Sequence, residues 1–134
     1  MVESFKWLYE NTDLSQEQIE FLKNYKKPFT VLAHCPYIEM ILNLEQEDFC
    51  YENKESYKKI AFRVANNEIQ TKLIDETGPI FLTSANFSGE KEIYTIEEAR
   101  KQFATFGKSI TFLVGNENIR SLPINKPSDI FEFE

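Results

Sequence analysis

The sequence is poor in several residue types, and each shortage excludes a class of protein. It contains two cysteines and one histidine in 134 residues, and Cys35, Cys50 and His34 match no zinc-ligand spacing. We therefore expect reduced, partly buried thiols and no metal held by protein side chains. No apolar run approaches the about 20 residues that a membrane-spanning helix needs, and no basic and then apolar leader opens the chain. These shortages predict a soluble cytoplasmic protein without a membrane partner.

Basic residues are outnumbered as well. The 15 lysines and arginines oppose 22 aspartates and glutamates, which gives a formal net charge of −7 at pH 7. The densest basic pairs, Lys26-Lys27 and Lys58-Lys59, are short. A nucleic-acid surface needs a basic stripe that displaces counterions from phosphates, so direct binding of nucleic acid is not expected. An RNA-binding module stays open as an alternative from another functional class.

Glycine is scarce too, with four residues at positions 78, 89, 107 and 115, each where we predict that an element ends. The rest of the composition, 42% hydrophobic and 14% aromatic, is too rich in apolar side chains for a disordered chain. At this length, one domain over residues 1–134 can bury a self-sufficient core.

Local signals predict the elements. Ser15 and Gln18 form a capping box, so a helix is expected over 16–24. Pro28 ends this helix, and the residues that follow predict a buried strand over 29–33. Further expectations are strands over 60–64, 80–83, 109–114 and 130–134, helices from Asn66 or Asn67 to Gly78 and from Thr95 to Gly107, a strand or short helix over 37–44, and a loop over 45–56.

The packing of two segments can also be predicted. Ile69, Leu73 and Ile74 supply the apolar side chains of the helix that ends at position 78. Trp7 and Tyr9 precede the first predicted helix, and we expect a strand or staple packed on the core there rather than a docking patch. Strands that alternate with capped helices predict an α/β fold, a twisted mixed sheet with flanking helices.

The most informative segment spans residues 77–89. Its predicted strand runs directly into small and polar residues, among them Ser84 and Asn86. Ligands of α/β sheets bind beyond the carboxyl ends of strands, and short polar side chains there can hydrogen-bond phosphate oxygens. Ordinary turn chemistry explains the same residues equally well.

This segment, with Gly78-Pro79, Ser84-Ala85-Asn86 and Ser88-Gly89, resembles the signature of the YrdC-type threonylcarbamoyl-AMP synthase family. Three more segments resemble family segments in the same order: residues 25–32, residues 60–64 and residues 127–131. The resemblance extends over nearly the whole chain from about residue 25, and its most specific part is the Ser-x-Asn block.

The resemblance implies the YrdC fold and a nucleotidyltransferase that joins L-threonine, bicarbonate and ATP into threonylcarbamoyl-AMP for the t6A base of transfer RNA. It implies that Ser84 and Asn86 contact the nucleotide phosphates, with Thr83 and Ser88 as further candidates, and that Arg63 pairs with the threonine carboxylate. Mg²⁺ is expected to arrive with ATP as part of the substrate complex. No protein nucleophile is implied, because the reaction depends on positioning and charge neutralisation. An interstrand salt bridge is the alternative role of Arg63.

The sequence departs from the family pattern in its cations. It has no Lys-x-Arg motif, so we expect the chain to correspond to the family fold from its middle third onward. A working synthase, a non-catalytic nucleotide- or threonine-binding remnant, and one half of a split enzyme whose partner chain supplies the missing part all stay open. Lys26 and Lys27 replace a family Pro-Gly and are interpreted mainly as solvated side chains. His34, with no paired acid in evidence, is interpreted as structural rather than as a general base.

Overall fold

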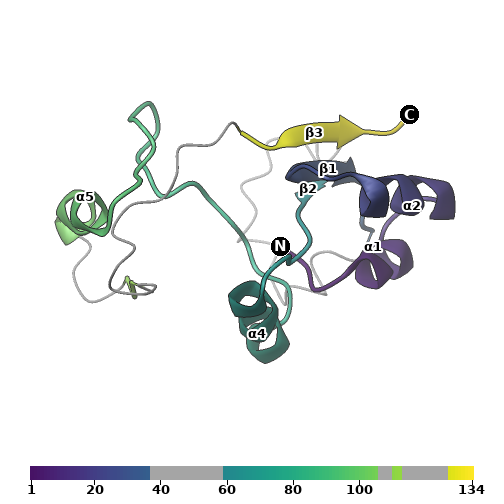
Figure 1. The fold of residues 1–134 in the computed structure, drawn as a ribbon, viewed down its shortest axis with the longest axis horizontal. Coiled ribbons are helices and arrows are strands. Elements are labelled where there is room, and N and C mark those ends of the chain that lie inside the picture. Colours follow the sequence, from purple (N-terminus) through teal and green to yellow (C-terminus); the bar gives the residue numbers. More distant parts are fainter. Residues whose placement is uncertain (37–58, 106–109, 113–126) are drawn as a thin grey trace. The chain divides into compact units, whose positions relative to one another are not determined.

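The structure is a computed structural model (Figure 1), and it describes four stretches of the chain: residues 1–36, 59–105, 110–112 and 127–134. The elements predicted over 37–44 and 45–56 lie outside these stretches. The chain forms two compact units, one of Met1–Leu82 with Pro127–Glu134 and one of Thr83–Lys126. The described sheet belongs to the first unit.

The first unit begins with helix α1 (Phe5–Asn11), which the sequence analysis did not predict. The Ser4 hydroxyl caps this helix by accepting a hydrogen bond from the backbone N–H of Trp7 at 3.1 Å. The Trp7 ring lies against Phe62 with ring centroids 5.9 Å apart. The segment therefore packs on the core as expected, but as a helix rather than as a strand or staple, and Tyr9 on its other side is 52% exposed.

Helix α2 (Gln16–Asn24) and strand β1 (Phe29–Ala33) have the predicted bounds. The capping box is complete, because the Gln18 N–H donates to the Ser15 hydroxyl at 3.2 Å and the Ser15 N–H donates to the Gln18 side-chain oxygen at 2.8 Å.

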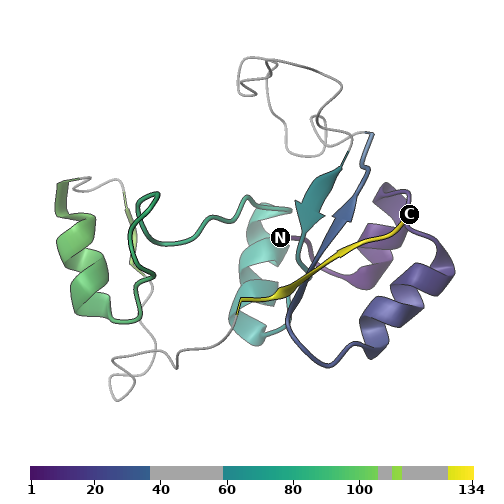
Figure 2. The same ribbon diagram turned by 90° about the horizontal axis from the view of Figure 1, so that it is seen from above.

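Strand β1 is the middle strand of a three-stranded mixed sheet in the order β2-β1-β3 (Figure 2), which confirms the predicted α/β class. Strand β2 (Ile60–Phe62) pairs with it antiparallel, and strand β3 (Asp129–Glu132) pairs with it parallel. Both outer strands differ in bounds from the predictions of 60–64 and 130–134. The first ends early because Val64 leaves the sheet and forms an isolated parallel bridge with Val2.

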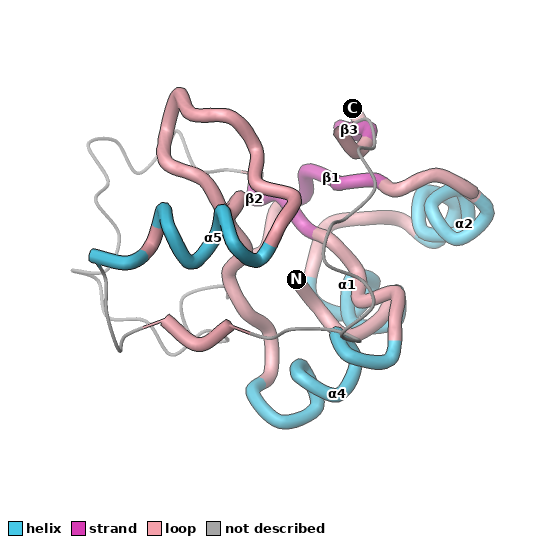
Figure 3. Tube along the Cα trace, turned by 60° about the vertical axis from the view of Figure 1, so that its left-hand side comes forward, coloured by secondary structure: helices cyan, strands magenta, loops and turns pink. Residues whose placement is uncertain are grey.

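Helices α1 and α2 lie together on one side of the strands (Figure 3) and bury the main core with them. Leu8, Leu22 and Val31, one from each of these helices and one from β1, are fully buried. Cys35 is buried in the same cluster, as expected for this thiol, and Cys50 lies outside the described residues. Alternation along β1 turns Thr30 to the face of the sheet opposite these helices.

Helix α4 (Glu68–Thr77) begins at the cap residue Asn67 and ends at Gly78, whose φ of 73° is the positive value that favours glycine. The prediction that Ile69, Leu73 and Ile74 supply the packed apolar side chains of this helix is wrong in part. Ile74 is buried, but Ile69 and Leu73 are 59% and 45% exposed. These two residues are four positions apart and share a helix face that does not contain Ile74, so only one turn of the helix contributes to the core.

The strand predicted over 80–83 is wrong. The Ile80 N–H donates to the carbonyl of Met1 at 3.1 Å, and the Ile80 carbonyl accepts from the Met1 ammonium at 2.6 Å. These bonds tie the segment to one residue rather than to a strand, and the preceding Pro79 has no N–H to donate. Phe81 and Leu82, expected in a buried strand, are 66% and 51% exposed.

In the second unit, helix α5 (Ile96–Gln102) begins at the predicted cap, because the Thr95 hydroxyl accepts from the Glu98 N–H at 3.2 Å. The helix ends before the predicted position 107, which lies outside the described residues. Residues 110–112, the described part of the strand predicted over 109–114, are not in a strand, and the described part of this unit contains no strand that could pair with them. None of the described helices is long and apolar enough to cross a membrane.

Candidate functional site

The register of the sheet brings three polar residues to one end of it. Arg63 directly follows β2, and Ser128 directly precedes β3. Val31 pairs with Phe62 in the antiparallel ladder, so the next residue after Phe62 lies beside Thr30 in β1. The parallel pairing of Phe29 with Asp129 places Ser128 at the same end of the sheet.

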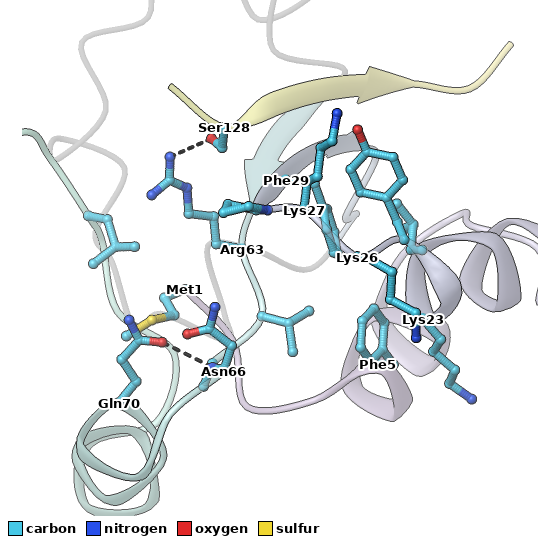
Figure 4. Close-up of a pocket in the computed structure, with 16 residues that line it drawn as sticks. Met1, Phe5, Lys23, Lys26, Lys27, Phe29, Arg63, Asn66, Gln70 and Ser128 are labelled. Carbon is cyan, nitrogen blue, oxygen red and sulfur yellow. Dashed lines mark hydrogen bonds between the residues drawn. The ribbon is translucent and has the colours of Figure 1, made fainter. Parts of the chain in front are cut away.

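The Arg63 guanidinium is held by two hydroxyl groups. Its Nε–H donates to Thr30 Oγ1 at 3.0 Å, and its Nη2 donates to Ser128 Oγ at 2.7 Å (Figure 4). The two hydroxyl oxygens are 3.2 Å apart, within hydrogen-bonding distance. These bonds occupy the edge of the guanidinium formed by Nε and Nη2. Two N–H groups on Nη1 and one on Nη2 are left, and one N–H from each of these nitrogens forms the other two-donor edge of the planar fork.

No ion pair joins Arg63 to a carboxylate among the residues that the structure describes. The predicted alternative, an interstrand salt bridge, therefore has no partner in this part of the chain. The side chain is exposed, but its orientation is fixed by neutral acceptors that do not cancel its charge. A guanidinium edge in this state can take a carboxylate or phosphate with two parallel hydrogen bonds.

Arg63 lines a cavity of about 380 Å³ that lies entirely within the first unit. The cavity has an apolar side that includes Phe5 and Phe29, and a polar side that includes Asn66 and Gln70. The Asn66 N–H donates to the Gln70 side-chain oxygen at 3.0 Å, which holds the polar side together (Figure 4). A volume of this size is within the range of small-ligand sites.

The amino group of Met1 is also near this cavity, which Met1 lines. The Met1 ammonium donates to the Ile80 carbonyl, and burial together with the charge of Arg63 lowers the pKa of this amine below its ordinary value of 8.0. Both causes disfavour the charged form, burial more strongly. An anion in the cavity would reduce the second effect, the repulsion between the Arg63 charge and the Met1 ammonium.

The other predicted site residues, Thr83, Ser84, Asn86 and Ser88, lie in one loop of the second unit. Because residues 80–83 are not a strand, these side chains do not follow the carboxyl end of a strand, and that reason for expecting a ligand there fails. Arg63 lies in the first unit, so the structure divides the predicted site residues into two groups.

The Asn86 side chain organises this loop. Its Nδ2 donates to the carbonyls of Phe87 and Glu90 at 3.2 and 3.1 Å, and the Glu90 N–H donates to the Phe87 carbonyl at 2.9 Å. Gly89 has a φ of 84°, which matches the third position of a type II turn. Both amide hydrogens of Asn86 are therefore used inside the loop, and a phosphate oxygen would compete with two carbonyls for them.

His34 is fixed through its backbone. Its N–H donates to the Asp13 carboxylate at 2.9 Å, and its carbonyl accepts from the Asp13 N–H at 3.0 Å. Both bonds are made by the backbone of His34, so the structural role predicted for its imidazole stays a prediction. Among the described residues, no three His, Cys, Asp or Glu side chains lie close enough together to hold a metal ion.

Thr30 and Ser128 were missed as site residues by the sequence analysis. Both lie in segments with family resemblance, but 98 positions separate them. The missing signal was the pairing register of the strands, which a single sequence does not provide.

Comparison with protein families gives a match over nearly the whole chain. The model Sua5_yciO_yrdC, described as "Telomere recombination", matches residues 1–133. Comparison with curated proteins and with solved structures gave no match. The matched range includes Thr30, Arg63 and Ser128 as well as the Asn86 loop.

Proposed function

Because the chain belongs to the Sua5/YciO/YrdC family, we propose that it forms threonylcarbamoyl-AMP from L-threonine, bicarbonate and ATP, as a step toward the t6A base of transfer RNA. The family match and the YrdC-type segments support the reaction class. The observation that carries the proposal is the Arg63 guanidinium, which is held by Thr30 and Ser128 and has one edge left for a ligand.

In this proposal the free edge of Arg63 takes the threonine carboxylate. Hydrogen bonds between charged groups contribute about 1.5–3 kcal/mol each in a protein environment, and a bidentate pair also fixes orientation. The polar side of the cavity, with Asn66 and Gln70, offers amide oxygens to the threonine ammonium and hydroxyl.

The chemistry requires positioning more than a reactive side chain. The threonine amine bonds to the bicarbonate carbon with loss of water, which gives a carbamate. A carbamate oxygen then bonds to the α-phosphorus of ATP, and the bond from that phosphorus to the pyrophosphate oxygen breaks. Mg²⁺ arrives on the ATP phosphates as part of the substrate, and charge neutralisation accelerates such a transfer.

The nucleotide half of the proposal involves the loop of the second unit. We propose that the hydroxyls of Ser84, Thr83 and Ser88 contact phosphate oxygens, with Asn86 shaping the loop through its two internal bonds. The three hydroxyl residues are exposed, which leaves them accessible to a ligand.

The test combines threonine binding with turnover. Calorimetry should show that Arg63→Ala weakens L-threonine binding by about ten- to a hundredfold, and Arg63→Lys should recover little of it because lysine lacks the planar fork. L-threonine amide, which has no carboxylate charge, should bind weakly to every variant. Arg100→Ala, an exposed arginine in the last turn of α5, is the matched control and should bind L-threonine normally.

Turnover is measured as pyrophosphate release from ATP in the presence of threonine and bicarbonate. Release that requires all three substrates supports the synthase. Threonine binding that depends on Arg63 without any release supports the ligand-binding alternative instead. Unchanged threonine affinity in Arg63→Ala would remove the assigned role of this residue in either case.

A further inference from the structure

The cavity beside Arg63 has an unusual charge composition for this chain. Among the residues that the structure describes, its lining carries four basic side chains, Lys23, Lys26, Lys27 and Arg63, and no aspartate or glutamate. The whole sequence has 22 acidic and 15 basic residues, so an average patch would carry more acids than bases. The described lining of this cavity is therefore a positive region on a negatively charged protein.

Two of these lysines lie in the short connection between α2 and β1. Lys26 and Lys27 lie between Tyr25, which is the C-cap residue of α2, and Pro28, which directly precedes β1. Their side chains are exposed and make no ion pair among the described residues. Lys23, by contrast, pairs with Glu20 at 3.7 Å.

The Arg63 guanidinium and the lysine side chains lie in different parts of the cavity lining. The guanidinium is fixed in orientation by its two hydroxyl partners, whereas Lys23 and Lys26 extend away from it (Figure 4). A single carboxylate at Arg63 would leave the positive charges of Lys26 and Lys27 uncompensated. The cavity, at about 380 Å³, also has room for a ligand larger than one amino acid.

We propose that Lys26 and Lys27, in the lining of this cavity, bind the polyphosphate chain of a nucleoside triphosphate. This inference rests on the proposed function and deepens it, because the sequence has no Lys-x-Arg motif to supply the cations for that chain. The two lysines compensate the phosphate charge, and Arg63 orients the carboxylate of the second substrate.

The physical effect of such lysines is mainly long-range. Lysine is a hydrated point charge on a flexible stem, so it follows a phosphate without strict geometry. An exposed pair of like charges raises the local concentration of a polyanion, and salt screens this effect over a Debye length of about 8–10 Å. A strong dependence of binding on ionic strength is thus expected.

The experiment uses the whole chain with inorganic triphosphate and with ATP as probes. The double variant Lys26→Gln/Lys27→Gln should bind both about tenfold more weakly at low salt, and the difference should shrink at high salt. The matched control is Lys6→Gln/Lys72→Gln, which changes the net charge equally. These two lysines lie outside the cavity lining and pair with Glu10 and Glu68.

The possible outcomes separate this inference from the proposed function. Triphosphate binding that depends on Lys26 and Lys27 supports the inference even if no pyrophosphate is released. If both double variants bound triphosphate equally weakly, the effect would come from the net charge of the protein alone. That result would overturn the inference. Normal ATP affinity in Lys26→Gln/Lys27→Gln would overturn it as well, while leaving threonine binding at Arg63 as a separate result. A short single-stranded RNA that binds more tightly than ATP at physiological salt would replace the nucleotide with RNA as the ligand.

Discussion

The phenol of Tyr25 donates a hydrogen bond to the carboxylate of Asp129, a residue 104 positions further along the chain. This bond joins the end of α2 to the first residue of β3. The Tyr25 ring also meets Phe131 edge-on, with centroids 4.8 Å apart. The contact therefore holds the outer parallel strand against the end of the helix that precedes Lys26 and Lys27 in the cavity lining.

Because of this bond, we expect the free energy of unfolding to decrease with pH in the alkaline range. The hydrogen bond to Asp129, followed by burial and by the charge of Asp129, raises the pKa of Tyr25 above its ordinary value of 10.0. The folded chain thus keeps a phenol proton at a pH where the unfolded chain loses it, so the stabilisation is present below pH 10 and is lost as the pH rises through the higher folded pKa. Urea unfolding at about pH 8 and about pH 11 should show a larger loss for the natural chain than for Tyr25→Phe. Equal losses would contradict this assignment.

The hydroxyls of Thr30 and Ser128 act as positioning residues for Arg63. Thr30→Val and Ser128→Ala each remove an acceptor, so the guanidinium gains freedom and L-threonine affinity should fall by about three- to tenfold. Neither change should weaken binding further in an Arg63→Ala background, and that comparison separates positioning from direct contact. Thr71→Val on the exposed side of α4 is the matched control. A full additional loss in the Arg63→Ala background would mean that these hydroxyls touch the ligand themselves.

The Asn86 loop can be tested without any ligand. Asn86→Ala removes both internal bonds, and Asn86→Asp replaces the donor with an acceptor that faces two carbonyls. Both variants should speed hydrogen exchange of the Glu90 amide by roughly fivefold, since one lost hydrogen bond corresponds to about 1 kcal/mol. Ser88→Ala in the same loop should leave the exchange rate unchanged. Normal protection in Asn86→Asp would show that the turn does not depend on this side chain.

The predictable part of the fold was specified by neighbouring residues. The capping box of Ser15 and Gln18 gave the start of α2, and Pro28 separated it from β1. The caps at Asn67 and Thr95 were likewise visible, because a cap is a contact between residues three positions apart.

Most of the parts that failed depend on distant partners. Residues 80–83 have the composition of a strand, but Ile80 bonds to Met1, 79 positions away, and no strand ladder forms there. Ile69 and Leu73 have helical spacing, but what packs against a face cannot be predicted from the spacing itself. Helix α1 lacks a capping box, but its single cap, from the Ser4 hydroxyl to the Trp7 N–H, is a contact between residues three positions apart, so this helix was missed despite a local signal.

The candidate site divides in the same way. Arg63 could be found because it follows a recognisable strand and matches a family segment. Its partners Thr30 and Ser128 required the register of two strand pairs. The role proposed for Lys26 and Lys27 depends on the cavity, because in the sequence they are two exposed charges in a short connection.

The parallel pairing of β3 with β1 has a kinetic consequence for the site. Joining Thr30 to Ser128 closes a loop of 98 positions, and such closures delay folding far more than they reduce stability. A chain in which only β1 and β2 have paired would hold Arg63 through Thr30 alone, without the second bond to Ser128. In the proposed function, the edge that takes the carboxylate is then fully oriented only when the parallel strand docks, and a chain that loses that strand by local opening loses this orientation at the same moment.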